Sequence, residues 1–274
     1  MSLLIEKLSL VFTLGNMKAT HLNYSFDDSL SRIDEILDAD NNQYEEKKSI
    51  PARSELTYTN GYYVNCSSLF VDICDSSKLT DYQNRPVLAK IYRSFISELV
   101  SYLNSFDCCK EVNINGDCVW GVFDTPQKKD IDIVFGVACG CRSLIDILNY
   151  KLEKKKYKTY EVGIGIDYGR ALMIKAGHKG STINDVIWMG DVVNSACHLA
   201  AKGNSTWSNG YPIMLSDVFY NNLNEQHQGL CSYNASCSCY QSGGVKVFMN
   251  DWLNEQLEKD RKNNTNIGWE NWTY

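Results

Sequence analysis

The chain lacks any apolar run that could cross a membrane. No uninterrupted apolar stretch among its 274 residues approaches the roughly 18–20 residues that a membrane span needs. The apolar amino terminus is interrupted at Glu6 and Lys7, and no small-residue cleavage site follows it. We therefore interpret residues 1–16 as a dispensable leader or an alternative start, and we expect a cytoplasmic protein without a membrane partner.

An excess of positive charge is also missing. The chain carries 27 lysines and arginines against 33 aspartates and glutamates, a formal net charge of −6. This balance argues against a surface that coats nucleic acid, so no nucleic-acid partner is expected. An acidic protein that handles an anionic substrate has to recruit cations locally, which favours a metal-centred site.

The cysteines lack the spacing of a disulfide framework. Their number, 11, is odd, and they are spread over predicted strands and helices, which indicates a reducing compartment. Cys231, Cys237 and Cys239 form a cluster that could bind zinc, but it lacks paired C-x-x-C spacing. Buried or loop thiols are therefore the preferred interpretation.

Strands and helices alternate along the chain, which predicts an α/β fold. Apolar residues repeat at 3.6-residue spacing from Val87 to Leu103 and predict a long amphipathic helix. Ser216 is expected to cap a short helix that runs to Leu223. The other expected elements are a loose helical pattern within residues 20–57, strands at 62–72, 160–167, 171–175 and 186–189, a hairpin around Asp117, helices at 130–154, 191–201 and 251–259, β segments at 213–215 and 245–248, and a loosely held tail at 262–274.

Two aspartates stand at the ends of predicted strands, one after a short apolar strand and one in the turn after an alternating strand. The segment from Ser68 to Ser77 reads as a strand that ends on Asp72 and breaks at once into a polar turn. The segment from Val112 to Phe123 reads as a hairpin with Asp117 at its tip. Aspartates at the ends of neighbouring strands can hold hard divalent cations, which steer phosphate chemistry. An Asx turn or a helix cap would also explain Asp72, but the pairing favours the metal role.

Four motifs together resemble the class III nucleotidyl cyclase catalytic domain, in order and in spacing, across roughly residues 60–220. They are Phe70-x-Asp72-Ile73-x-x-Ser76-Ser77, Asn115-Gly116-Asp117, Gly163-Ile164-Gly165-Ile166 and Gly190-Asp191-Val192-Val193-Asn194-x-Ala196-x-x-Leu199-Ala200. The resemblance implies a ferredoxin-like α/β (α+β) domain with an antiparallel-rich sheet and flanking helices. It also implies a head-to-tail homodimer with its sites between two chains. The expected segments are an extension at 1–57, the catalytic domain at 58–225, and a strand, helix and tail at 226–274.

The resemblance implies that a ribose 3′-hydroxyl attacks the α-phosphorus of a nucleoside triphosphate while diphosphate leaves. Two divalent cations, Mn²⁺ or Mg²⁺, held by Asp72 and Asp117 would lower the pKa of the hydroxyl and neutralise the triphosphate. The backbone carbonyl of Ile73 is a further metal ligand by resemblance. The turn after it is expected to bind the β- and γ-phosphates through backbone N–H groups, and its residues are Cys74, Asp75, Ser76 and Ser77.

Asn194 would come from the partner chain and orient the ribose, by the same resemblance. The arginine that the family carries four residues later is replaced by His198. An imidazole clamps a transition-state phosphate less well than a bidentate guanidinium. Either His198 serves weakly, or the metals carry more of the load, or another cation substitutes for the arginine. The candidate cations are Lys78, Arg170 and Lys202.

The base-recognition positions also depart from the purine cyclases. Asn113 and Ile187 stand where those enzymes carry their base readers. Losing both readers indicates a changed substrate, because buried polar readers reject the wrong base strongly. The pattern resembles the bacterial pyrimidine cyclases of Pycsar antiphage defence. In that group an aromatic or arginine on the first strand contributes to the base pocket, which makes Tyr63 the candidate and Tyr62 the alternative.

The expected activity is therefore the conversion of CTP to 3′,5′-cyclic CMP, a messenger that acts on a separate cyclic-pyrimidine-sensing effector. The Asn113 amide complements cytosine, but the same amide, flipped, suits uracil, so a uridylate cyclase remains open. A purine cyclase and a non-catalytic nucleotide-binding module are further alternatives. The presence of both Asp72 and Asp117 argues against the non-catalytic module.

Overall fold

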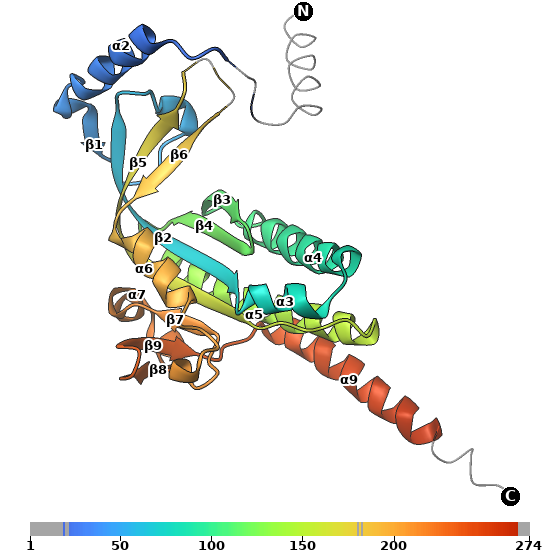
Figure 1. Cartoon of the computed structure of the whole chain (residues 1–274). Helices are drawn as coiled ribbons and strands as arrows, with labels where there is room; N and C mark the ends of the chain where they lie inside the picture. Colours follow the sequence, from blue (N-terminus) through green and yellow to red (C-terminus); the bar gives the residue numbers. More distant parts are fainter. Residues whose placement is uncertain (1–18, 20–21, 180, 182, 268–274) are drawn as a thin grey trace, which may run out of the picture. The chain divides into compact units, whose positions relative to one another are not determined.

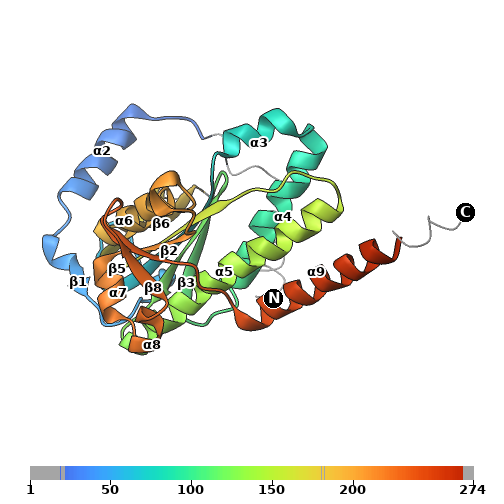
Figure 2. The same ribbon diagram turned by 90° about the horizontal axis from the view of Figure 1, so that it is seen from below.

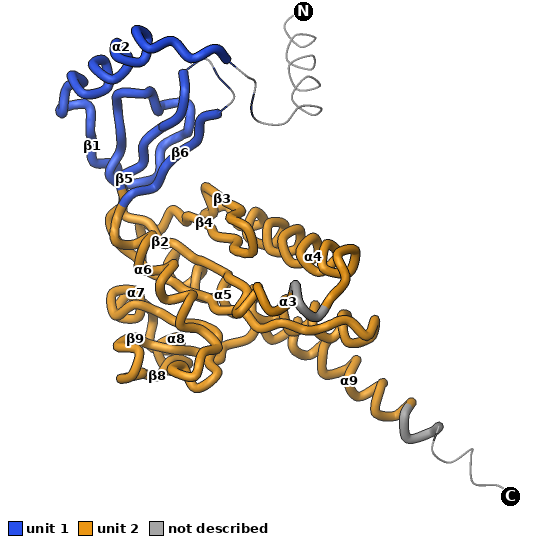
Figure 3. Tube along the Cα trace, viewed as in Figure 1, with its two compact units in different colours: residues 1–64, 172–189 blue, residues 65–171, 190–274 orange. Residues whose placement is uncertain are grey.

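A computed structural model of the chain (Figures 1 and 2) describes residue 19, residues 22–179, residue 181 and residues 183–267. The leader expected at residues 1–16 lies outside these residues. The chain forms two compact units (Figure 3): unit 1 comprises residues 1–64 and 172–189, and unit 2 comprises residues 65–171 and 190–274. Two long strands, β2 (Gly61–Ile73) and β5 (Val162–Gly177), contribute to both units.

Unit 2 is built on a mixed sheet. Its described strands lie in the order β3-β4-β2-β5-β7-β9-β8. β5 pairs with β7 in parallel, whereas β2–β4, β3–β4, β7–β9 and β8–β9 are antiparallel. The expected α/β fold with an antiparallel-rich sheet and flanking helices is confirmed. The strand bounds are β3 (Cys109–Asn115), β4 (Cys118–Asp124), β7 (Ile213–Leu215), β8 (Cys231–Asn234) and β9 (Cys239–Ser242).

Two long helices, α4 (Arg85–Leu103) and α5 (Lys128–Lys154), cover one face of this sheet. Asn84 caps α4 by accepting a hydrogen bond from the amide of Val87. α9 (Val247–Ile267) lies along α5 in Figure 2, held by a 2.5 Å ion pair between Lys154 and Asp260. The core between sheet and helices includes Leu69, Val71, Ile91, Phe95, Val134 and Ile164.

α6 (Asp191–Ala200) packs on the opposite face of the sheet. Phe70 alternates with the core residues Leu69 and Val71, and its ring contacts Ala196 and Ala200 of this helix. A Cβ atom at Gly165 would collide with the carbonyl of Ala196. The glycine therefore allows the helix backbone to lie directly on β5.

Unit 1 contains the early elements and the ends of the two long strands. β1 (Tyr44–Glu46) pairs in parallel with the start of β2, and β6 (Asn184–Met189) pairs antiparallel with the end of β5. α2 (Phe26–Leu37) begins after Ser25, whose hydroxyl accepts a hydrogen bond from Asp28 N. None of its residues is buried. The short helices of the two units are η1 (Asn41–Gln43), η2 (Arg53–Glu55), α3 (Ser76–Tyr82), η3 (Thr206–Ser208), α7 (Asp217–Asn222) and α8 (Glu225–Gln228).

Most elements match the sequence predictions. Ser216 does cap α7, because its hydroxyl accepts a hydrogen bond from Phe219 N at 3.0 Å. The β segment predicted at 245–248 is wrong, since α9 begins at Val247 and extends well beyond the predicted 251–259. The β8–β9 hairpin was not predicted, because its strands are short and largely polar. No helix among the described residues has the length and apolar character to span a membrane.

Candidate active site

Asp72 and Asp117 lie close together in unit 2. Asp72 pairs with Cys118 across β2–β4, so Asp117, at the tip of the β3–β4 hairpin, is the residue next to its partner. Gly116 has a φ of 64°, a conformation that glycine adopts without strain, and this permits the tight turn. Burial and, second, the negative charge of Asp117 raise the pKa of the Asp72 carboxyl to about 6.

The pair has the chemistry of a cation site. Two carboxylates on half-buried side chains repel one another, and the raised pKa of Asp72 records both burial and this repulsion. A bound divalent cation would relieve the repulsion, because carboxylate oxygens are ligands that Mg²⁺ and Mn²⁺ prefer. The residues therefore fit the metal role. The described residues contain no cluster of three or more histidine, cysteine, aspartate or glutamate side chains that could hold a metal.

The predicted triphosphate turn is partly occupied by protein contacts. The amide of Cys74 donates a hydrogen bond to the carbonyl of Glu161 at 2.9 Å, so this amide is not open to a phosphate. Asp75 takes a left-handed backbone conformation and forms a 2.6 Å ion pair with Lys78. The phosphate role of Asp75, Ser76 and Ser77 stays a prediction.

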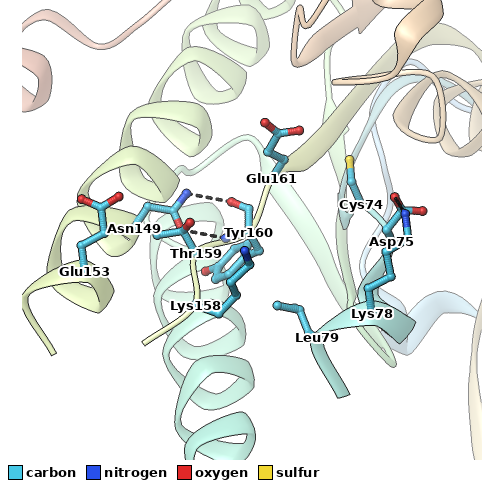
Figure 4. Close-up of a pocket in the computed structure, with 10 residues that line it drawn as sticks. All are labelled: Cys74, Asp75, Lys78, Leu79, Asn149, Glu153, Lys158, Thr159, Tyr160 and Glu161. Atoms are coloured by element: carbon cyan, nitrogen blue, oxygen red, sulfur yellow. Dashed lines mark hydrogen bonds and ion pairs between the residues drawn. The ribbon is translucent and has the colours of Figure 1, made fainter. Parts of the chain in front are cut away.

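A cavity of about 520 Å³ adjoins this turn (Figure 4). Cys74, Asp75 and Lys78 line one side, and the segment that leads into β5 lines the other. That segment is held by Asn149, which donates to the carbonyl of Tyr160 at 2.7 Å and accepts from its amide at 3.2 Å. Because Lys78 and Lys158 share the lining with three carboxylates, the cavity is mixed in charge rather than a simple anion site.

Asn194 and His198 lie one turn apart on α6 and are both exposed. The helix packs through Val192, Ala196 and Leu199, which leaves these two side chains directed away from the core. Cys197, between them in sequence, has a thiol pKa that is raised by burial and by the charge of Asp72. The Cys197 thiol of α6 is thus within electrostatic range of Asp72. The roles of Asn194 and His198 stay predictions.

The three alternative cations differ in their surroundings. Lys78 is paired with Asp75, as described above. The ammonium of Lys202 donates to the carbonyl of Cys237 at 3.0 Å, which anchors the β8–β9 loop to the end of α6. Arg170 is exposed on β5 and has a polar interaction of its own. The ammonium of Lys202 is therefore already used in a structural hydrogen bond, whereas the side chain of His198 is exposed.

The predicted base-pocket residues fall in different units. Asn113 lies on β3 of unit 2, and its side-chain nitrogen is buried without a hydrogen-bond partner among the described residues. Tyr63 and Ile187 belong to unit 1, on β2 and β6. Tyr62 donates its hydroxyl hydrogen to the carbonyl of Glu55, and Lys47 lies over its ring, so it is engaged within unit 1. Tyr63 also has an interaction of its own, so the choice between Tyr63 and Tyr62 stays a prediction.

The sequence predictions missed Trp120. Its indole stacks on Phe70 with ring centroids 4.9 Å apart and planes at 2°, and its N–H is buried without a partner among the described residues. Trp120 pairs directly with Asn113 across the β3–β4 hairpin. The hairpin register, counted from the Gly116–Asp117 turn, would have placed the two side chains on one face.

Comparisons with known proteins give a consistent picture. Residues 59–238 match the family model described as the adenylate and guanylate cyclase catalytic domain. The chain is 35% identical over 240 residues to a uridylate cyclase from Treponema porcinum, covering 86% of this chain and 83% of that protein. It is 37% identical over 262 residues to a uridylate cyclase from Gulbenkiania mobilis, covering 87% of this chain and 99% of that protein.

Solved structures show the same fold. The adenylyl cyclase CyaB from P. aeruginosa superposes with a TM-score of 0.57 at 18% identity, covering 68% of this chain and 97% of that one. The guanylyl cyclase Cya2 superposes with a TM-score of 0.55 at 14% identity, covering 68% of this chain and 95% of that one. At such identities the likeness concerns the fold alone.

Proposed function

This chain belongs to the adenylate and guanylate cyclase catalytic domain family, and we propose that it is a pyrimidine nucleotide cyclase that converts UTP to 3′,5′-cyclic UMP and diphosphate. The observation that carries the proposal is the Asp72–Asp117 pair at adjoining strand ends, in a chain that resembles two uridylate cyclases over most of its length. The names of these relatives favour UTP over the CTP that Asn113 alone suggested.

CTP remains the second candidate substrate. The carboxamide of Asn113 carries a donor and an acceptor, and a 180° flip exchanges their places. One orientation complements uracil and the other complements cytosine. Ile187, whose apolar side chain is 42% exposed, offers no hydrogen-bonding group to either base.

In the proposed mechanism Asp72 and Asp117 would hold divalent cations. When bound, such cations would lower the pKa of the attacking 3′-hydroxyl and neutralise the triphosphate charge. Asn194, from the partner chain of a homodimer, would orient the ribose. Correct orientation matters because in-line displacement requires the hydroxyl, the phosphorus and the leaving oxygen to be aligned.

His198 would act at the position of the missing arginine in this proposal. It is exposed on α6, but an imidazole supplies at most one charge and no planar fork. The aspartate-held cations would therefore carry a larger share of the charge stabilisation than in an arginine-containing relative.

The decisive experiment is incubation of the purified full chain with Mn²⁺ and each of ATP, GTP, CTP and UTP, followed by chromatographic separation of the products. Cyclic UMP as the main product supports the proposal, and cyclic CMP would shift it to the second candidate. Cyclic AMP or cyclic GMP would contradict the pyrimidine assignment. No product from any nucleotide, with Mn²⁺ or Mg²⁺, would refute cyclase activity.

We further propose that the product serves antiphage signalling through a separate effector, as the resemblance to Pycsar systems implies. Cells that express the chain together with a cyclic-pyrimidine-sensing effector should then lower phage plating efficiency. Cells that express the Asp117→Ala variant with the same effector should not. Equal phage plating efficiency on the two strains would contradict the defence role, but it would not contradict the proposed cyclase activity.

A further inference from the structure

Two neighbouring buried nitrogen donors on one face of the unit 2 sheet have no hydrogen-bond partner in the described part of the chain. They are the side-chain nitrogen of Asn113 and the indole N–H of Trp120, neither of which has a hydrogen-bond partner among the described residues. Buried donors without partners are rare in folded proteins because desolvation is then uncompensated. Two such donors side by side therefore call for a ligand that supplies acceptors.

The register of three strands places these donors next to each other. Asn113 pairs with Trp120 across β3–β4, and Trp120 pairs with Phe70 across β2–β4. Directly opposed residues project from the same face of a sheet, so the three side chains form one row. The stack on Phe70 holds the indole ring in place.

The row lies against α6, the helix that carries Asn194. Trp120 packs against a cluster of Phe70, Ala196 and Ala200, to which Val193 also contributes. Val193 precedes Asn194, the proposed ribose-orienting residue. A base read by this row and a ribose held by α6 would therefore be contacted by the same chain of the proposed homodimer, while the aspartate pair would come from the other chain.

We propose that the Trp120 indole N–H and the Asn113 carboxamide together read the pyrimidine base. This inference rests on the proposed cyclase function and deepens it by naming Trp120 as a second base-reading residue. The two side chains supply three groups, namely the indole donor, the amide donor and the amide acceptor.

These three groups complement either pyrimidine and neither purine. Uracil presents acceptor, donor and acceptor along O4, N3–H and O2, which two donors and one acceptor satisfy completely. Cytosine presents donor, acceptor and acceptor along N4, N3 and O2, which the same groups satisfy once the amide is flipped. Adenine leaves one donor without a partner, and guanine presents two donors to a single acceptor. A site with such buried readers rejects the wrong base strongly.

An unpartnered indole N–H alone would not carry this inference. Trp188 on β6 of unit 1 also has a buried N–H without a partner among the described residues, and the buried hydroxyls of Ser68, Tyr102 and Tyr160 share this state. Trp120 differs because a second unpartnered donor lies directly opposite it. Trp188 therefore serves as the matched control for any effect of losing an indole N–H.

The test compares Trp120→Phe with Trp188→Phe in the full chain. Phenylalanine keeps an aromatic ring against Phe70 and removes the donor together with the second ring of the indole, a loss that Trp188→Phe matches. We expect kcat/KM for UTP to fall about 3- to 10-fold in Trp120→Phe, mainly through KM, because one neutral hydrogen bond is lost. Trp188→Phe should match the unmodified chain.

Thio-substituted nucleotides separate base reading from a packing effect. Sulfur accepts hydrogen bonds weakly, so 2-thio-UTP or 4-thio-UTP should be a poorer substrate than UTP for the unmodified chain. The penalty for one of the two analogues should vanish in Trp120→Phe, and the penalty for the other should shrink in Asn113→Leu. If both penalties persist in both variants, the side chains do not contact the base and the inference is overturned.

Binding measurements keep this inference separate from the proposed activity. Calorimetric titration of UTP in the presence of Ca²⁺ reports affinity without requiring turnover. A chain that binds UTP, loses about 3- to 10-fold affinity in Trp120→Phe and yields no cyclic product would refute the cyclase proposal while supporting the reader. Equal UTP affinity in Trp120→Phe, Trp188→Phe and the unmodified chain would refute the base-reading role of Trp120, even if cyclic UMP is made.

Discussion

Units 1 and 2 use amphipathic helices in opposite ways. α2 of unit 1 shows apolar residues at helical spacing, yet none of its residues is buried. α4 of unit 2 shows the same spacing and buries Ile91, Phe95, Leu99 and Leu103 against the sheet. The pattern predicts a helix in both units, but only the surroundings decide whether the apolar face contributes to stability.

The difference extends to chemistry. Unit 2 holds the aspartate pair, α6 and the donors of Asn113 and Trp120, whereas unit 1 carries the predicted base-pocket residues Tyr63 and Ile187 and exposes an apolar helix face. We therefore expect substitutions at these sites and in the core of unit 2 to lower cyclase activity or the free energy of unfolding. Substitutions on the α2 face should change neither in the isolated chain.

The largest effect is expected from Asp117→Asn. The substitution keeps the size of the side chain and removes the charge that a cation would bind. Cyclase activity with UTP and Mn²⁺ should fall by more than about 10³-fold, because several kcal/mol of charge stabilisation are lost. The melting temperature should change little, since Asp117 lies in a surface turn. Activity within tenfold of the unmodified chain would contradict the metal role of Asp117.

The second prediction concerns Ile91→Ser on α4. Ile91 has no exposed surface, so the substitution leaves a cavity and buries a hydroxyl without a partner. We expect the free energy of unfolding, measured by urea denaturation, to fall by about 3–5 kcal/mol. A loss below about 1 kcal/mol would show that the α4 face is not packed as described.

The third prediction tests the close contact between α6 and β5. Gly165→Ala should lower the free energy of unfolding by about 1–3 kcal/mol, because its Cβ would collide with the α6 backbone. A shift of α6 should also lower kcat through Asn194. The matched control is Gly136→Ala on α5, where a Cβ meets no atom within 4 Å. That variant should be neutral or stabilised by about 0.5–1 kcal/mol.

The sequence predicts the aspartate pair because Asp72 ends an apolar strand and Asp117 follows the glycine of a hairpin turn, and both patterns are local. It predicts Ser216 for the same reason, since a cap depends on residues within one helical turn. Trp120 was missed because its significance depends on the register of three strands that are far apart in sequence. The β8–β9 hairpin was missed because its polar strands obtain their place from pairing with β7. Turns and helix caps can thus be predicted from neighbouring residues, whereas the pairing of strands that are far apart in sequence cannot.

The smallest effect is expected from Ile33→Ser on α2, the same substitution as in the second prediction. Ile33 is 48% exposed, and isoleucine and serine have similar helix propensities. The free energy of unfolding should therefore change by no more than about 0.5 kcal/mol, against several kcal/mol for Ile91→Ser. A loss above about 1.5 kcal/mol would mean that the α2 face is covered in solution. Size-exclusion chromatography of both forms would then show whether a second copy of the chain provides the cover, because Ile33→Ser would shift the elution towards a smaller species.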